Sequence, residues 1–331
     1  MKLVRIIIVL TLSLFGLKFC ICSFHAENPY LNPTNKYIKA GTDLDRIQKL
    51  INRGEDVDTR DRRTGLTALH VLANFMNRHS IRNYNSKKQM IDYYKTAELL
   101  LNNGANVNVT DWDGQTVLRY CGIDIECVKF FLKYGVDVNI GLPIYHPVCM
   151  DTLDLVKLYV ANDADVNVRD PKKTTPLFCC KSREMAKLLI NNGADVNVRD
   201  SEGRTPLFSS SNNDAAIELM IKNGADVHAK NIKGETALFQ PFLEIERVKL
   251  FVKYKINVNE QDNTGKTVLH HILMKRKYPY DKLVLELLKS GARVDIRDND
   301  GKTPLDIISE RLEESDDLKD IYELVLKYKD R

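Results

Sequence analysis

Two segments of the sequence contain the residues that close a phosphate-binding loop. Residues 265–267 and 301–303 both read Gly-Lys-Thr, and in such a loop the lysine contacts phosphate while the hydroxyl holds magnesium. The loop also requires another glycine five residues earlier. Glu260 and Ile296 occupy those two positions, so we expect both segments to be structural turns.

The histidines and nucleophilic side chains do not form a catalytic pattern either. His70 and His270 each follow a Thr-x-Leu segment, with no carboxylate or cysteine at catalytic spacing. The sequence contains no His-Glu-x-x-His, no Cys-x-x-Cys and no nucleophile-elbow motif. We therefore expect no enzyme, no metal site and no cofactor. An enzyme site would have to lie in the irregular segment 140–150, as a cleft with several perturbed titratable groups.

The charge balance argues against a nucleic-acid-binding protein. The 331 residues carry a formal net charge of +4, and three of the basic residues, Lys2, Arg5 and Lys18, lie at the N-terminus. Without them the net charge is +1, which is too small for a protein that binds through backbone phosphates. The content of 44% hydrophobic and 28% charged residues is ordinary for a folded protein.

The first 23 residues have the layout of a secretory signal peptide. A short basic start is followed by an apolar run over residues 6–17 and then by small residues. Lys18 interrupts the run before the roughly 20 apolar residues that a membrane-spanning helix needs. We expect residues 1–23 to be a signal peptide, or a hydrophobic anchor if Lys18 reaches the headgroups. Residues 24–35 would then be a linker.

A short phrase recurs through the rest of the chain at intervals close to 30 residues. A second phrase, Asp-x-x-Gly-x-Thr, follows most copies, and an amphipathic helix precedes the next copy. Its glycine favours a tight turn and its threonine caps a helix. A period near 30 predicts a solenoid rather than independent domains. The first phrase reads Gly-Ala-Asn-Val-Asn at 104–108 and Gly-Ala-Asp-Val-Asn at 193–197, with variants at 54–58, 135–139, 164–167, 224–228, 256–259 and 291–295.

Together the two phrases resemble the ankyrin repeat over about residues 36–328. The resemblance implies an all-α ankyrin-repeat solenoid of about eight to nine helix-turn-helix units with short β-hairpin tips. The unit at 140–167 is irregular because it lacks the turn phrase. The first full repeat carries extra polar residues at 77–92, which we expect to loop out as an insertion.

The resemblance also implies structural roles for the histidines and cysteines. His70 and His270 would bridge neighbouring repeats through backbone hydrogen bonds. Equivalent positions in adjacent ankyrin units lie about 10 Å apart, beyond the roughly 7 Å Cα limit for a disulfide. We therefore expect buried free thiols, which pack as small hydrophobes. They are Cys121, Cys127, Cys149, Cys179 and Cys180.

The turn residues of such repeats contribute little to the core and are free to specify a partner. Trp112 is the only tryptophan, and exposed tryptophan and arginine are frequent interface hot spots. The alternatives are that Trp112 packs on a neighbouring tip or on the 77–92 insertion, and that the basic residues belong to a solvated, mixed-charge rim. The predicted partner-binding residues are Trp112, Arg60, Arg62, Arg63, Arg169, Lys172, Lys173, Arg199, Lys230 and Lys233.

The predicted function is recognition of another protein by a rigid concave surface, with no nucleic acid and no small-molecule substrate. The repeat style resembles poxvirus ankyrin proteins, which implies capture of a host protein. The alternative is an intracellular adaptor for ubiquitin-dependent degradation of a bound host protein. The leader favours the secretory pathway over the host cytoplasm, with membrane contact only if residues 1–23 stay uncleaved. Asn108 is then a glycosylation acceptor.

Overall fold

A computed structural model describes residue 36 and residues 42–82, 87–209, 211–240, 243–275, 280–312 and 319–329. The predicted leader and linker, residues 1–35, lie outside these ranges. Within them, the helices are too short or too polar to cross a membrane. The chain forms two compact units, one ending at Tyr120 and the other beginning at Cys121.

The first unit pairs outer helices with inner helices, as the repeat pattern predicts. Asp43 caps the first outer helix by accepting a hydrogen bond from the backbone N–H of Arg46, 3.0 Å away, and this satisfies an amide that the helix leaves free. The outer helices are α3 (Leu44–Asn52) and α5 (Lys87–Asn102), and the inner helices are α4 (Ala68–Arg82) and α6 (Val117–Cys121).

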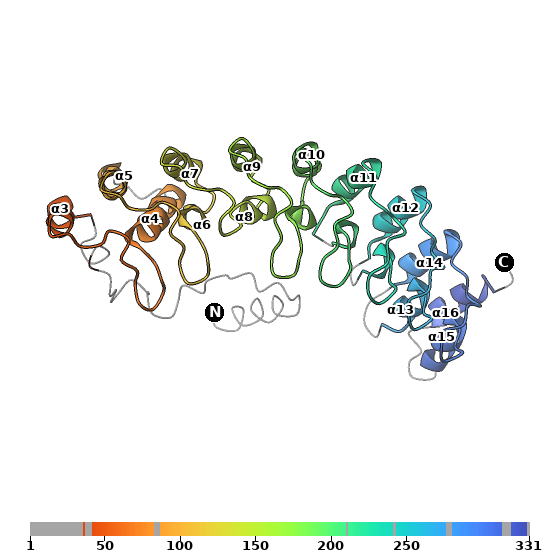
Figure 1. Ribbon diagram of the computed structural model, residues 1–331. Coiled ribbons are helices and arrows are strands. Elements are labelled where there is room, and N and C mark those ends of the chain that lie inside the picture. The colour runs from red at the N-terminus through yellow and green to blue at the C-terminus, as the bar shows by residue number, and fades with distance from the viewer. Residues whose placement is uncertain are drawn as a thin grey trace. The chain divides into compact units, whose positions relative to one another are not determined.

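The second unit continues the alternation, with the outer helices along one side and the inner helices beneath them (Figure 1). The outer helices are α7 (Ile125–Leu132), α9 (Leu153–Val160), α10 (Arg183–Asn191), α11 (Asp214–Lys222), α12 (Ile245–Lys253), α14 (Asp281–Lys289) and α16 (Lys319–Leu326). The inner elements are α8 (Tyr145–Cys149), η2 (Pro176–Cys179), η3 (Pro206–Phe208), η4 (Ala237–Phe239), α13 (Val268–Leu273) and α15 (Pro304–Leu312).

The core follows from the spacing of apolar residues in the outer helices. In α9, Leu155, Val156 and Tyr159 are fully buried, and residues at positions i, i+1 and i+4 share one face of a helix. Met185, Ala186 and Leu189 repeat the pattern in α10, and the valine of every repeated phrase after the first is buried as well. Stacked helix pairs therefore form the predicted all-helical solenoid.

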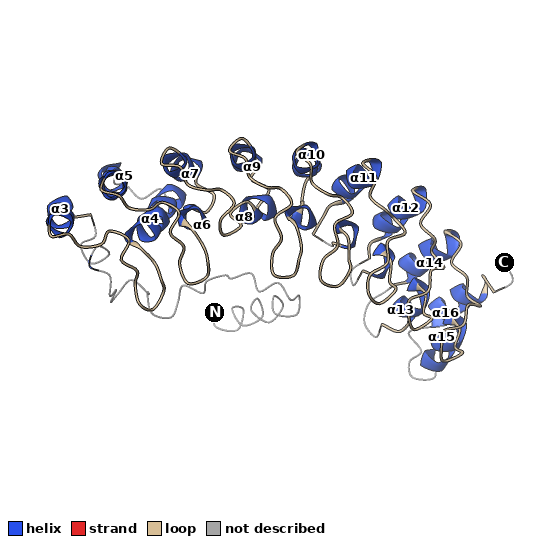
Figure 2. Ribbon diagram, viewed as in Figure 1, coloured by secondary structure: helices blue, strands red, loops and turns tan. Residues whose placement is uncertain are grey.

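The predicted β-hairpin tips are turns in the structure, because the described residues contain no strand (Figure 2). Two backbone hydrogen bonds, such as Asp111 N–H to the Gln115 carbonyl at 2.9 Å and Gly114 N–H to the Asp111 carbonyl at 3.2 Å, close each of these turns. We call these segments the tips. They are residues 61–66, 111–115, 170–174, 200–204, 231–235, 262–266 and 298–302.

The predicted loop insertion at 77–92 is wrong for the part that the structure describes. Helix α4 continues to Arg82 and α5 begins at Lys87. The added residues lengthen both helices of the repeat, and the rings of Phe75 and Tyr93 stack across them with centroids 5.4 Å apart. Lengthening two packed helices keeps their backbone groups bonded, whereas a long loop would leave them to water.

The inner helix shrinks to a 3₁₀ turn in three consecutive repeats. Side chains of the following repeat bond the carbonyls that a full helix would have used. Asn212 Nδ2 donates to the Leu177 carbonyl at 3.1 Å and Ser209 Oγ to the Phe178 carbonyl at 2.6 Å. Gln240 Nε2 does the same for Leu207 at 2.8 Å. These bonds give partners to backbone carbonyl groups that the shortened helices leave free.

Four asparagines each join one repeated phrase to the next. Asn197 Nδ2 donates to the Gly224 carbonyl at 2.9 Å, and its Oδ1 accepts from the Asp226 N–H at 2.8 Å. Asn139, Asn167 and Asn259 make the same pair of bonds to their own neighbours. The equivalent position after Gly224 is His228, whose imidazole cannot reproduce both the donor and the acceptor of an amide in that geometry.

Replacing His228 with asparagine is expected to stabilise the second unit. The new amide would face the Lys255 carbonyl and the Asn257 N–H, which correspond to the partners of Asn197. Two added hydrogen bonds at an exposed site predict a gain of about 1 kcal/mol in the free energy of unfolding. Urea denaturation measures it, with Asn197→His as the matched reverse change. A loss of stability in His228→Asn would contradict the joining role of the asparagines.

Candidate partner-binding surface

In four of the tips the first residue is a buried aspartate that holds the turn: Asp61, Asp111, Asp200 and Asp298. Asp111 is 5% exposed, and its Oδ1 accepts hydrogen bonds from the N–H groups of Asp113 at 2.8 Å and Gln115 at 2.9 Å. Asp200 and Asp298 are equally buried and make the same bonds. These carboxylates are therefore absent from the exposed faces of their tips, whereas Asp113, Glu202 and Asp300 are exposed on the same tips.

Backbone hydrogen bonds tie neighbouring tips of the second unit into a row. The N–H of Ser201 donates to the Lys172 carbonyl at 2.8 Å, and the N–H of Ile232 donates to the Glu202 carbonyl at 3.0 Å. The row continues from Asn263 to Lys233 and from Asn299 to Thr264. These bonds fix the spacing of the tip backbones, so little backbone entropy is left to lose in an ordering step.

Trp112 both packs and stays exposed. Its backbone and indole lie against Gly65 of the preceding tip, where an added Cβ would come within 2.6 Å of the Trp112 nitrogen. The guanidinium of Arg60 lies 5.1 Å from the centroid of the indole ring, a cation–π contact. The side chain is nevertheless 59% exposed. The predicted packing on a neighbouring tip is thus present, and it orients a large apolar surface toward solvent.

Replacing Gly65 with alanine is expected to displace Trp112. Gly65 and Gly114 both have φ of +75°, but an added Cβ meets nothing within 4 Å at Gly114. Gly114→Ala should therefore lower the free energy of unfolding only through its left-handed backbone conformation. Gly65→Ala should lower it by at least about 1 kcal/mol more. Urea unfolding and the fluorescence of the single tryptophan measure both effects. Equal losses of stability with unchanged emission in the two variants would refute the packing contact.

Two of the three basic residues predicted in the first unit lie on the same tip as Gly65. Arg62 and Arg63 are exposed, and Arg60 is half-buried beneath the indole of Trp112. Of the four predicted contact residues of this unit, Arg62, Arg63 and Trp112 therefore belong to the adjacent tips 61–66 and 111–115. Arg60 lies in the segment that leads into the first tip.

The six basic residues predicted in the second unit are all exposed, yet they differ in their contacts. Arg199 Nη1 donates to the carbonyls of Gly203 at 2.8 Å and Lys230 at 2.6 Å, which makes it a brace between two tips. The Lys230 ammonium pairs with Glu260 at 2.6 Å. The exposed set is Arg169, Lys172, Lys173, Arg199, Lys230 and Lys233.

Ile232 was not among the predicted contact residues. It is 66% exposed, follows the first residue of its tip as Trp112 does, and lies against Gly203 of the preceding tip. The signal was present in the sequence, because an isoleucine at an otherwise polar turn position is unusual. It adds an exposed apolar side chain next in sequence to Lys233.

Both motif histidines have the predicted bridging role. His70 Nδ1 accepts from the Thr67 N–H at 3.1 Å, and its Nε2 donates to the Gln115 carbonyl of the next repeat at 3.1 Å. His270 bonds Thr267 and Lys302 in the same way. Burial lowers the pKa of both imidazoles, so each is the neutral tautomer with its hydrogen on Nε2. The described residues hold no cluster of ligands for a metal ion.

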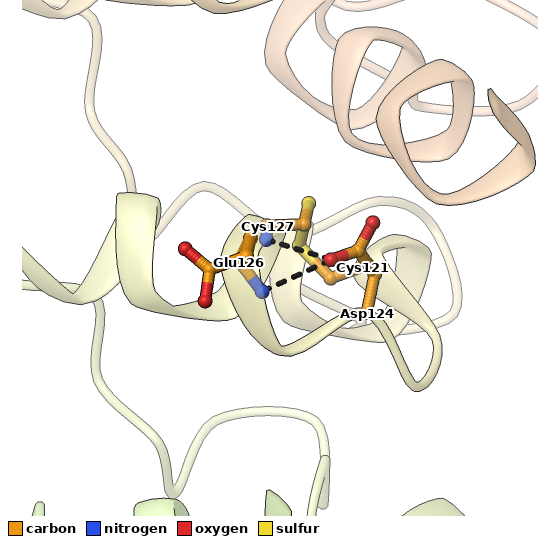
Figure 3. The surroundings of a disulfide bond; sticks show 4 residues. All are labelled: Cys121, Asp124, Glu126 and Cys127. Atoms are coloured by element: carbon orange, nitrogen blue, oxygen red, sulfur yellow. Dashed lines mark hydrogen bonds between the residues drawn. A yellow bond between two sulfur atoms is a disulfide. The ribbon is translucent and has the colours of Figure 1, made fainter. Parts of the chain in front are cut away.

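The prediction of five free thiols is wrong for Cys121 and Cys127, which form a disulfide with Cα atoms 5.6 Å apart (Figure 3). Cys121 ends α6 and Cys127 lies in the first turn of α7. Asp124 caps α7 between them by accepting from the N–H groups of Glu126 and Cys127. The sequence argument compared equivalent positions in neighbouring repeats and overlooked a pair within one repeat, where the short turn brings two helices together.

The irregular unit at 140–167 contains a helix pair, α8 and α9, as other repeats do, but the backbone before α8 differs. Gly141 and Leu142 have φ of 78° and 56°, which reverses the chain without a tip. The Tyr145 hydroxyl donates to the Thr174 carbonyl and accepts from the Asp170 N–H at 3.3 Å, so it supports the next tip. Its raised pKa comes from burial. These contacts join the unit to the tip at 170–174.

Glycosylation of Asn108 stays a prediction. Asn108 is half-buried and holds the position in its repeat that Asn139 and Asn197 hold in theirs. In those two residues the amide nitrogen donates to a backbone carbonyl, and a glycan on that nitrogen would leave it one hydrogen for such a bond.

The family model for ankyrin repeats (three copies) matches residues 36–141 and 146–231, more than half of the chain. Two curated relatives, both ankyrin repeat protein OPG189 of variola virus, are 33% identical over 138 residues. The match covers 39% of this chain and only 23% of the relatives. The crystal structure of an ankyrin repeat domain from Acinetobacter baumannii AYE aligns with a TM-score of 0.47 and 26% identity, over 56% of this chain and 97% of that domain.

Proposed function

Because this chain belongs to the ankyrin repeat family, we propose that it is a non-catalytic module that binds another protein through its tips. The observation that carries the proposal is Trp112. Its indole is held in one orientation by Gly65 and Arg60 and is 59% exposed. A fixed, exposed tryptophan offers large apolar area at a low entropy cost, as interface hot spots do.

The partner surface that fits the second unit is acidic with an apolar recess. Lys173 and Lys233 are exposed on the tip row, and Ile232 lies beside Lys233. Asp200, on the tip between them, is turned inward, so it competes little with a partner's carboxylates. Electrostatic complementarity of this kind raises the association rate more than the affinity, and salt weakens it.

The partner proposed for both units is a host protein, which the module sequesters. The support is the similarity to variola virus ankyrin repeat proteins, of whose length the chain spans about a quarter. The alternative, an adaptor for ubiquitin-dependent degradation, makes a different prediction in cells. The bound protein would then fall in amount, and a proteasome inhibitor would restore it, whereas a sequestered protein keeps its level.

We also propose that the chain enters the secretory pathway. The Cys121–Cys127 disulfide supports this, because disulfides persist in oxidising compartments and are rare in the cytosol. Intact mass spectrometry of protein expressed in mammalian cells, with and without glycosidase, tests the proposal. Loss of about 23 residues, as signal peptidase would remove, together with a glycan on Asn108 is expected. Full-length, unglycosylated protein in the cytosol would contradict it.

Binding itself is tested with the tagged full-length chain expressed in mammalian cells. A host protein should be recovered in a one-to-one complex, and its recovery should fall when Lys233 is changed to glutamate. Lys187→Glu on the outer helix α10 makes the same charge change at another exposed lysine of the second unit. Equal loss of binding in both variants would show a general charge effect and remove the tip row from the proposal.

A further inference from the structure

In the part of the chain that the structure describes, three cysteines are thiols besides the Cys121–Cys127 pair, and they gather where two repeats meet. Cys149 is the last residue of α8 and Cys179 is the last residue of η2, and these two inner elements pack against each other. Cys149 and Cys180 are buried, whereas Cys179 is partly exposed. The group therefore spans two consecutive inner elements that the chain separates by 30 residues.

Two of the three sulfur atoms are in direct contact. The Cys179 thiol donates a hydrogen bond to the Cys149 sulfur. The segments that carry them are joined next to this contact by a second bond, from Ser182 Oγ to Asp151 Oδ1 at 2.6 Å. Cys180 is fully buried and begins the extended segment after η2, so its side chain points away from that of its neighbour.

From this juxtaposition we propose that Cys149 and Cys179 form a reversible disulfide between the two repeats when the protein meets a hydroperoxide. The proposal does not depend on partner binding. With both disulfides formed, four of the five cysteines outside the leader are bonded, and Cys180 is left as a single buried thiol.

The chemistry begins at Cys149. The hydrogen bond from Cys179 and the nearby Lys181 ammonium lower the pKa of the Cys149 thiol, whereas the same hydrogen bond and burial raise that of Cys179. The Cys149 thiolate attacks one peroxide oxygen, breaks the O–O bond and becomes a sulfenic acid, and the released hydroxide takes up a proton. The Cys179 sulfur then attacks the Cys149 sulfur, forms the S–S bond and expels water. With hydrogen peroxide, two thiols and one peroxide molecule thus give one disulfide and two water molecules.

The test uses the purified full-length protein and hydrogen peroxide. After treatment the protein is denatured, its remaining thiols are alkylated, and its peptides are mapped by mass spectrometry without reductant. The expected product is a peptide linking Cys149 to Cys179, with Cys180 alkylated and the Cys121–Cys127 bond as the internal control. The cross-link should also raise Tm by several degrees, and dithiothreitol should reverse both changes.

Two variants test which cysteines form the disulfide. Cys180→Ala places the residue that ankyrin repeats usually carry at that position, and it should keep the Cys149–Cys179 peptide. Cys179→Ser should abolish the cross-link and leave a Cys149 sulfenic acid that dimedone traps. The proposal is overturned if peroxide leaves Cys149 and Cys179 alkylatable while Cys121 and Cys127 are bonded. It is overturned as well if Cys149 links to Cys180 instead.

Discussion

Replacing His270 with alanine is expected to lower the free energy of unfolding by about 3 kcal/mol. The imidazole is completely buried, and it bonds the N–H and hydroxyl of Thr267 within its repeat and the Lys302 carbonyl of the next. Alanine leaves three polar groups without their partner and opens a cavity between two repeats. Urea denaturation followed by circular dichroism measures the loss.

The matched control for His270→Ala is His228→Ala. His228 is exposed and lies in the loop after α11, in the same unit, so its loss should change stability by less than about 0.5 kcal/mol. Similar losses in both variants would contradict the bridging role of His270.

The same histidines give the stability a defined pH dependence. The folded-state pKa of His70 and His270 is lowered by burial, whereas an unfolded histidine titrates near about 6.5. Between the two values the unfolded chain binds more protons, so stability rises with pH there. The contribution is fully present above about pH 6.5 and is lost as the pH falls below it. His270→Ala should flatten part of this slope, and an unchanged slope would argue against a neutral imidazole.

Replacing Trp112 with alanine is expected to weaken binding of the host partner by at least about 30-fold, the loss typical of a hot spot. The indole offers the partner an exposed face whose other side is already packed on Gly65. Calorimetry or surface plasmon resonance with the purified partner measures the change.

The control for Trp112→Ala removes an equally exposed apolar side chain elsewhere in the first unit. Ile91 is 51% exposed on α5, and Ile91→Ala should leave the affinity unchanged within a factor of two or so. Thermal melting of both variants separates a loss of contact from a loss of fold. A Trp112→Ala variant that binds as tightly as the parent would assign Trp112 to packing alone.

Periodic features of the chain could be predicted from the sequence because the same physical problem recurs in every repeat. The helix pairs, the tight tips and the bridging roles of His70 and His270 all follow from phrases that occur several times. Each copy confirms the interpretation of the others, and the local propensities agree with the packing.

Features that occur once were predicted poorly. The Cys121–Cys127 pair depends on the angle between two helices within one repeat, which spacing between repeats does not reveal. The insertion at 77–92 is polar in sequence, yet it extends α4 and α5 because helix ends can grow without disturbing the stack. The exposed Ile232 could have been found by aligning the tips, since it occupies the position of Trp112.

The most direct test of the proposed function is quantitative affinity purification of the tagged chain from mammalian cells. It compares the parent protein with Trp112→Ala in the first unit, Lys233→Glu in the second, and the controls Ile91→Ala and Lys187→Glu. A protein-binding module that acts through its tips predicts a stoichiometric host protein that both controls retain and that at least Trp112→Ala loses. Recovery of the same proteins in equal amounts by all five chains would contradict it.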